Sequence, residues 1–268
     1  MRWLAALLGV ALIACGGSHP EAKDASSDDV TPAEQHALVA ADKLGRAIYL
    51  QDVAAARATD AMLAMTEGQP DPHVRGWVTL ETNWGYRVQF VAPSDAGLLV
   101  LYEVDVPRWG GKVRTRTLRP PEPASTEAEL QFRAREAVLK WGFRSCSRTY
   151  NTVVLPGELL GQRGHLVYAL AATTDPGKLV IGGHHRFLVS EDGTTVLAEL
   201  PLSKDCMTLE RREDAVGITV SSLVQPVPNE GHYFVSLLYG MPLHVSAGGR
   251  LWSVDPGKRS KRSLPSAP

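Results

Sequence analysis

The spacing of apolar residues predicts helices at the start of the chain. After Thr31, apolar residues recur at helical spacing on one face: Ala37, Ala40, Ala41, Leu44, Ala47 and Ile48. Thr31 and Glu34 form a capping-box pattern around Pro32, which suits the first helical position. Asp52 is a second capping residue, so we expect a separate helix that begins at Asp52 and ends at Gly68.

Alternation of apolar and polar residues replaces the helical spacing in the next segment. Three strands are expected, over Trp77–Thr82, Tyr86–Ala92 and Leu98–Val106. The proline-rich segment 119–123 predicts a stiff, extended connection. Residues 126–141 return to helical spacing behind a capping-box pattern, so we expect one further helix there.

The second half of the chain has mostly the pattern of strands. The candidates are Thr152–Leu155, His165–Ala172, Leu179–Ser190, Thr194–Leu200, Gly217–Val224, His232–Tyr239 and Leu243–Val254. Asp192-Gly193 is typical of a two-residue hairpin turn, which pairs Val189 with Val196 and continues in register to Arg186 and Glu199. The predicted fold class is α+β, with N-terminal helices, a largely antiparallel sheet and one further helix.

The first residues have the pattern of an export signal. Arg2 precedes an apolar run, Trp3–Ala14, which is shorter than the roughly 20 residues of a membrane span and suits a signal peptide. The ending Leu12-Ile13-Ala14-Cys15 resembles the lipobox of bacterial lipoproteins. The resemblance implies that residues 1–14 are removed and that lipid is attached to Cys15. An ordinary cleaved signal with a chance cysteine is the alternative.

The residues after Cys15 suit an anchor on a flexible linker. Residues 15–30 carry too little apolar surface to order themselves, so we expect a lipidated cysteine followed by a tether. Gly16 stands where an Asp would indicate retention in the inner membrane. By the same resemblance, the expected location is the outer membrane, with the folded part facing the periplasm.

Composition points to an ordinary globular domain. The chain has 28 basic and 29 acidic side chains, a net charge of −1, so no nucleic-acid partner is expected. Residues 31–255 are long enough for one large domain or for two packed halves, 31–124 and 125–255. Residues 256–268 are expected to be a basic, disordered tail.

Two cysteines remain after Cys15, namely Cys146 and Cys206. In an oxidising envelope compartment such a pair usually forms a disulfide, with two buried free thiols as the alternative. The bond would close a loop of about 60 residues, which the chain-entropy model equates with roughly 4 kcal/mol of stability.

Histidines are the most prominent candidates for chemistry. His184 and His185 are neighbours on a predicted strand and therefore point to opposite faces. His185 shares the face of Phe187 and suits a buried histidine, whereas His184 is expected to be the freer side chain. Weak candidates for metal ligands are His184, His165, His232 and His244. No ligand pair has a diagnostic spacing, so we expect neither a metal nor a cofactor.

The sequence contains no complete catalytic motif. It lacks a Gly-x-Ser-x-Gly elbow, a Ser-x-x-Lys pair and a phosphate-binding glycine loop, so no catalytic residue is assigned and a non-enzymatic protein is favoured. Aromatic and basic residues suited to a sugar or peptide groove gather in the first sheet region: Trp77, Trp84, Tyr86, Trp109, Arg75, Arg87 and Arg108. The plainer interpretation of this group is a core with a charged rim.

Several segments resemble a group of uncharacterised bacterial envelope proteins. They are residues 58–61, residues 151–156, residues 182–187 and Asp192-Gly193. The resemblance implies no activity, substrate or catalytic residue. It favours a domain of its own kind over a degraded copy of a known enzyme.

Together these features predict a membrane-tethered periplasmic module that binds without catalysis. Its expected partners are the membrane, through the lipid on Cys15, and another protein or a cell-wall component of the envelope. The alternative is an envelope hydrolase or metal-binding protein with a site around His184 and Arg186.

Overall fold

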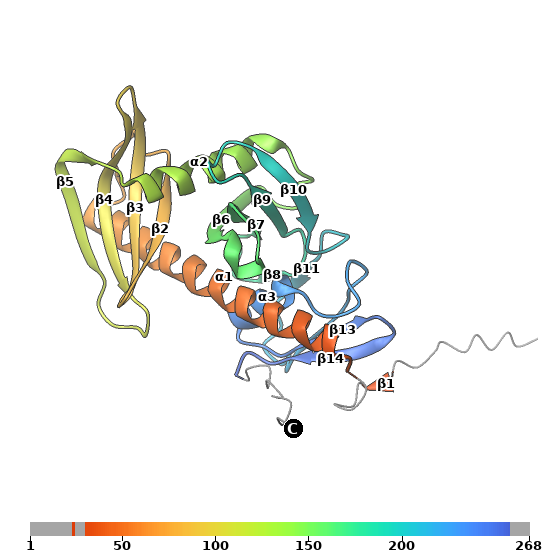
Figure 1. The fold of residues 1–268 in the computed structure, drawn as a ribbon. Coiled ribbons are helices and arrows are strands. Elements are labelled where there is room, and N and C mark those ends of the chain that lie inside the picture. The colour runs from red at the N-terminus through yellow and green to blue at the C-terminus, as the bar shows by residue number, and fades with distance from the viewer. Residues whose placement is uncertain (1–22, 25–29, 258–268) are drawn as a thin grey trace, which may run out of the picture.

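The computed structural model describes residues 23–24 and 30–257 and shows an α+β fold, as predicted, in which strands predominate (Figure 1). Within these residues the strands form four sheets, and most neighbouring strands are antiparallel. No helix among them is long and apolar enough to cross a membrane. The predicted signal peptide, Cys15, most of the tether and nearly all of the tail lie outside the described residues.

The first helix, α1, is one continuous helix over Pro32–Met65. Thr31 caps it and Glu34 completes the capping box, as expected. The prediction of a separate helix from Asp52 is wrong, because Asp52 lies in the middle of α1 and is buried. Asn151 Nδ2 donates to Asp52 Oδ1 at 2.9 Å. The Asp52 carboxylate therefore accepts a hydrogen bond from a distant residue, and not from the backbone N–H groups of a helix N-terminus as a cap would.

An antiparallel sheet packs against the C-terminal half of α1. Its order is β2-β3-β4-β5, over Gly76–Thr82, Gly85–Ser94, Gly97–Pro107 and Arg114–Pro123. The first three strands match the predicted ones, and the proline-rich segment is the end of β5. On one face, Val88 and Phe90 pack against Ala54 and Ala58 of α1. These small helix residues let α1 lie close to the sheet.

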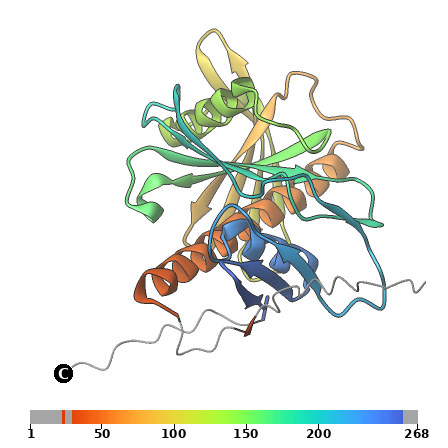
Figure 2. The same cartoon turned by 90° about the vertical axis from the view of Figure 1, so that its right-hand side faces the viewer.

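A second antiparallel sheet lies between the helix α2, Thr126–Trp141, on one face and the helices α1 and α3, the latter over Glu230–Tyr239, on the other (Figure 2). The strand order is β10-β9-β7-β6, over Val196–Pro201, His185–Val189, His165–Ala172 and Thr149–Pro156, and a short 3-10 turn, η2, follows β6 at Gly157–Leu160. Side chains alternate between the two faces, since Val167 and Phe187 contact the α2 layer and Tyr168 faces α1 and α3.

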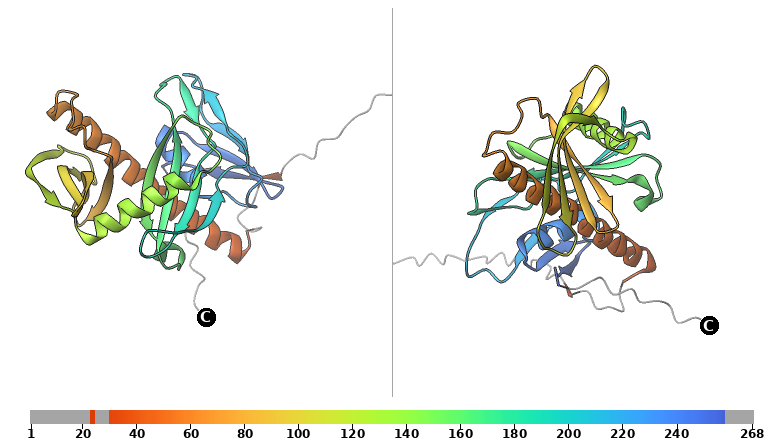
Figure 3. Two further views of the ribbon diagram at one scale, coloured as in Figure 1. Left: turned by 90° about the horizontal axis from the view of Figure 1, so that it is seen from above. Right: turned by 90° about the vertical axis from the view of Figure 1, so that its left-hand side faces the viewer.

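Two helices bridge the sheets. The helix α2, Thr126–Trp141, packs Phe132 against the first sheet and Val138 against the second. The helix α1 does the same on the opposite side, with Ala58 on the first sheet and Leu44 in the core of the second (Figure 3). The hydrophobic clusters therefore cross the boundary between the two halves considered from the sequence.

The segment 232–239 is a helix, and the predicted strand there is wrong. The helix α3 covers Glu230–Tyr239, with Asn229 as its cap and Gly240 in the left-handed conformation at its end. Every residue from 230 to 236 is buried, the polar ones included, so no exposed polar face marks the segment as a helix rather than a strand. Where α3 crosses α1, a Cβ atom on Gly45 would lie 2.4 Å from Tyr233 Cβ.

The remaining strands form two smaller sheets. One has the order β1-β14-β13-β12, over Lys23–Asp24, Arg250–Val254, Leu243–Ala247 and Ile218–Ser221; the other pairs β8, Lys178–Val180, with β11, Thr208–Glu210. Because β1 pairs with β14, two residues of the expected free tether belong to a sheet. The long strand predicted over 179–190 is divided into β8 and β9 by residues 181–184.

The turn between β9 and β10 is longer than a two-residue hairpin. Val189 pairs with Val196, as predicted, but a bulge follows and places Glu199 opposite Phe187. Asp192 Oδ1 accepts a hydrogen bond from Thr194 N at 3.1 Å, which stabilises the longer loop. The predicted pairing of Arg186 with Glu199 is therefore wrong by one residue.

A disulfide joins Cys146 to Cys206, with their Cα atoms 5.3 Å apart. It connects the loop after α2 to the loop after β10. Gly183 packs directly against it, since a Cβ atom there would lie 2.4 Å from Cys146 Cβ.

We predict that reduction of this disulfide lowers the melting temperature by several degrees. The bond closes a loop of 60 residues, so its loss raises the entropy of the unfolded chain by an amount worth roughly 4 kcal/mol. The measurement is a thermal melt followed by circular dichroism, with and without reductant. An unchanged melt after complete reduction would contradict the prediction.

Candidate functional site

The structure places His184 in the interior. The residue is only 2% exposed, its ring lies edge-on to Phe234, and its Nδ1 accepts the backbone N–H of Ala171 at 3.1 Å. The expectation that His184 is the freer of the two adjacent histidines is therefore wrong. His184 directly precedes β9, and α3 packs against this end of the strand. The helix therefore buries the face of the strand that the sequence pattern predicted to be exposed.

The other histidines do not gather around His184 as a metal site. His185 is buried as expected and its Nδ1 lies 2.9 Å from Glu199 Oε1. His232 is buried in α3, where its Nδ1 accepts the Asn229 N–H. His165 contacts the Glu191 carbonyl, and His244 lies on β13. In residues 23–24 and 30–257, no group of three or more His, Cys, Asp or Glu side chains is arranged to hold a metal ion.

Arg186 has a structural partner. Its Nη1 donates to Glu230 Oε1 at 2.7 Å, and the Tyr168 hydroxyl reaches the same oxygen at 3.4 Å. Burial and the nearby Glu230 carboxylate raise the pKa of Tyr168 well above its ordinary value. Because Glu230 begins α3, its negative charge also suits the helix N-terminus. This cluster fastens α3 to the second sheet.

A different place in the molecule has the form of a ligand site. A cleft of about 660 Å³ lies where the middle of α1, the ends of β6 and β7, and α3 meet. This volume is within the range of small-molecule sites. The lining residues are Asp52, Asn151, Leu170, Ala171, Ala172, Thr173, Thr174, Asp175, Pro176, Lys178, Arg211, Phe234, Leu238 and Tyr239.

The inner end of the cleft is polar and fixed. Asp52 is 8% exposed and is held by the amide of Asn151, which stands on the β6 face that packs toward α1. Burial raises the pKa of Asp52, and the hydrogen bond from Asn151 opposes this shift. The Tyr239 hydroxyl accepts the Val180 N–H at 2.7 Å and so ties β8 to the wall of the cleft.

The mouth of the cleft carries positive charge. Arg211 lies over the Tyr239 ring at 5.8 Å, and the Lys178 ammonium lies 3.7 Å from the Asp175 carboxylate. The cleft is also lined by the buried apolar side chains of Leu170 and Phe234. A molecule with an anionic group and an apolar body matches this arrangement.

Sequence reasoning identified Asp52 only as a cap and did not single out the cations at the mouth. One available signal was the helical spacing itself, because Ile48, Asp52 and Ala55 follow the i, i+4, i+7 pattern of a buried face. A polar residue at such a position indicates a buried carboxylate with a partner. That the partner is Asn151, 99 residues away, follows only from the fold.

The aromatic and basic group of the first sheet divides into two. Tyr86 is buried in the core and Trp77 packs against it, with Arg108 over the Tyr86 ring at 5.1 Å. Trp84 and Trp109 are 44% and 86% exposed. Tyr86 and Trp77 therefore belong to a core with a charged rim, whereas Trp84 and Trp109 belong to the surface.

The buried histidines predict a loss of stability in mild acid. Burial lowers the pKa of His184 and of His232 to about 4, with a smaller opposing contribution from nearby backbone groups. The unfolded chain therefore binds protons near pH 6.5 that the folded chain does not, and stability falls as pH drops from 7 towards 4. Each histidine contributes about 2 kcal/mol of this loss between pH 7 and pH 5.

The measurement is urea denaturation at pH 7 and pH 5. The variant His36→Gln changes an exposed histidine of α1 and should keep the same pH dependence as the natural protein. Equal free energies of unfolding at the two pH values would contradict the conclusion that His184 and His232 are buried in their neutral form.

Comparison of the chain with models of protein families, with curated proteins and with solved structures finds no match.

Proposed function

We propose that this chain is a lipid-anchored envelope protein that binds a small organic anion with an apolar body in the cleft at Asp52. The observation that carries the proposal is the set of groups that line the cleft: two exposed cations, buried apolar side chains, and the buried, hydrogen-bonded pair of Asp52 and Asn151. Such a set of groups suits a ligand that combines an anionic group with an apolar body.

Binding without catalysis suits the groups that line the cleft. The fourteen lining residues include neither a histidine nor a cysteine, the commonest general base and the most reactive nucleophile. Asp52 is already hydrogen-bonded to Asn151, so the buried carboxylate of the cleft is engaged with a protein partner. The cleft therefore favours a binding module over a hydrolase.

The proposed anchor is the lipid on Cys15, as the lipobox resemblance implies. Residues 16–22 separate Cys15 from β1, and a flexible linker of seven residues would span roughly 15 Å, so the folded part would lie close to the headgroups. The folded part would face the periplasm from the outer membrane.

We predict that naphthalene-1-sulfonate binds the full chain and that loss of the mouth cations weakens this binding at least tenfold. The double variant Lys178→Ala/Arg211→Ala removes both charges that attract the sulfonate, and both residues are exposed, so the fold should persist. The measurement is isothermal titration calorimetry of detergent-solubilised protein. Detergent partitioning is the same for all variants and cancels in the comparison.

Two matched variants define the site. Lys140→Ala/Arg163→Ala removes the same charges from exposed positions outside the cleft and should leave the affinity unchanged. Leu238→Trp, at the rim, should narrow the cleft and weaken binding. Equal affinity in all of these proteins would overturn the proposed site.

A separate prediction concerns the anchor. Cys15→Ala removes the thiol that carries lipid, so the protein should leave the membrane fraction, which immunoblotting of separated membranes would detect. Persistence of the variant in the membrane fraction would mean that another feature holds the protein there.

A further inference from the structure

A second cavity lies at the other end of the molecule and shares no residue with the cleft. It measures about 360 Å³ and is lined by Trp84, Asp105, Pro107, Lys112 and Arg114. These residues come from the β2–β3 turn, from the end of β4 and from the start of β5. Here α1 does not cover the sheet, because it packs on the opposite face.

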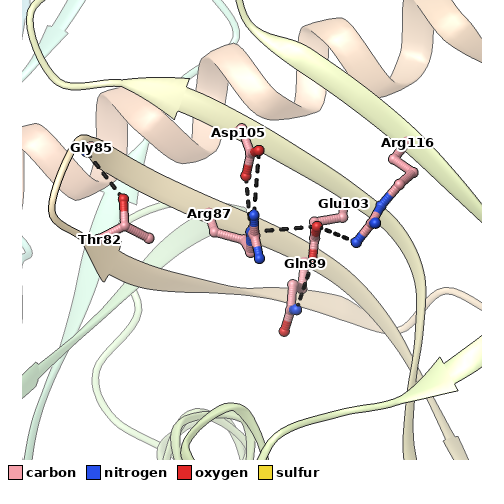
Figure 4. Close-up of polar contacts among 7 residues, drawn as sticks. All are labelled: Thr82, Gly85, Arg87, Gln89, Glu103, Asp105 and Arg116. Atoms are coloured by element: carbon pink, nitrogen blue, oxygen red, sulfur yellow. Dashed lines mark hydrogen bonds and ion pairs between the residues drawn. The ribbon is translucent and has the colours of Figure 1, made fainter.

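The turn that carries Trp84 is fixed at both ends. Gly85 N donates to Thr82 Oγ1 at 3.1 Å (Figure 4), and the Trp84 carbonyl accepts the Arg108 N–H at 3.2 Å. Gly85 lies so close to the neighbouring strand that a Cβ atom would be 2.2 Å from the Val106 carbonyl oxygen. An indole that is 44% exposed therefore stands on a rigid support.

The carboxylate of the cavity is held in place by a network across β3, β4 and β5 (Figure 4). Arg87 Nε donates to Asp105 Oδ1 at 2.9 Å and lies 3.4 Å from Glu103 Oε1. Glu103 is buried and also accepts hydrogen bonds from Gln89 at 3.0 Å and from Arg116 at 2.7 Å. The charges of Arg87 and Arg116 are thus matched by Glu103 and Asp105.

The loop that brings Lys112 to the cavity is fastened to α1. Arg57 Nη2 donates to the Gly111 carbonyl at 2.7 Å, and Arg57 Nη1 reaches the Pro107 carbonyl at 3.4 Å. Lys112 and Arg114 are exposed and form no ion pair with any residue that the structure describes. The cavity therefore presents two uncompensated positive charges beside a planar aromatic ring.

We propose that this cavity binds an acidic saccharide. The C–H bonds on one face of a pyranose ring are weakly positive and suit the negative face of the Trp84 indole. A sugar carboxylate suits Lys112 and the forked guanidinium of Arg114. Asp105 accepts only, so it suits a sugar hydroxyl donor. Four of the five lining side chains thus find a partner on one uronic-acid residue.

Neutral sugars and acidic peptides match the cavity less well. A neutral sugar would leave Lys112 and Arg114 without an anion, and an acidic peptide would pair with them but would not need the face of Trp84. The proposal is independent of the cleft, since none of its residues lies there.

The test is calorimetric titration of the full chain with three probes: trigalacturonic acid, maltotriose and triglutamate. We expect trigalacturonic acid to bind at least tenfold more tightly than either of the others, and its affinity should fall as salt is raised. Equal binding of triglutamate would mean a plain anion site, and equal binding of maltotriose would mean that charge plays no part. Either result would overturn the proposal, as would failure of all three to bind.

Variants separate the contributions. Trp84→Ala and the double variant Lys112→Gln/Arg114→Gln should each weaken trigalacturonic acid binding at least tenfold. Trp141→Ala changes another exposed tryptophan, at the end of α2, and should leave the affinity unchanged. Thermal melts of each variant would show that the fold is intact. Unchanged affinity in Trp84→Ala would refute the stacking role of the indole.

Discussion

Close packing along a single helix is the constraint on which the rest of the structure depends. The helix α1 is an uninterrupted element that contributes to the cores of both larger sheets. At one end Gly45 lets Tyr233 of α3 approach, and at the other Ala54 and Ala58 let the first sheet approach. A larger side chain at any of these positions would push the packed layers apart.

The same helix positions both proposed binding sites. Asp52 lies at the inner end of the cleft and Arg57, little more than one turn further along, holds the loop that carries Lys112. The chain has almost balanced charge, with 28 basic and 29 acidic side chains, so the cations at these two places are a local feature. Local arrangement, rather than net charge, decides which ligands such a surface attracts.

Much of this fold could be predicted from the sequence, because several segments have strong local patterns. The capping box at Thr31, the alternating strand at Tyr86 and the helix over 126–141 depend on neighbouring residues only. The wrong predictions concern segments whose secondary structure depends on contacts with residues far away in the sequence. Asp52 has the local properties of a cap, yet Asn151 binds it within a helix, and the apolar segment from His232 to Tyr239 has no local feature that excludes a strand.

The candidate sites follow the same division. Trp84 was singled out from the sequence with nearby aromatic and basic residues, but Asp105, Lys112 and Arg114, the charged residues of its cavity, were not. The cleft joins α1 to β6, β7 and α3, whose contacting residues are far apart in the chain, so no short pattern could reveal it. The histidines misled for a related reason, since His184 enters the interior only because α3 covers that end of the second sheet.

Hydrogen–deuterium exchange of the full chain tests the continuity of α1 most directly. If α1 is one rigid helix, the amides of residues 50–56 should exchange as slowly as those of residues 42–48, and only through global unfolding. Rapid exchange confined to residues 50–56 would mean that the helix breaks at Asp52. The cleft and the saccharide site would then lack the common support proposed for them.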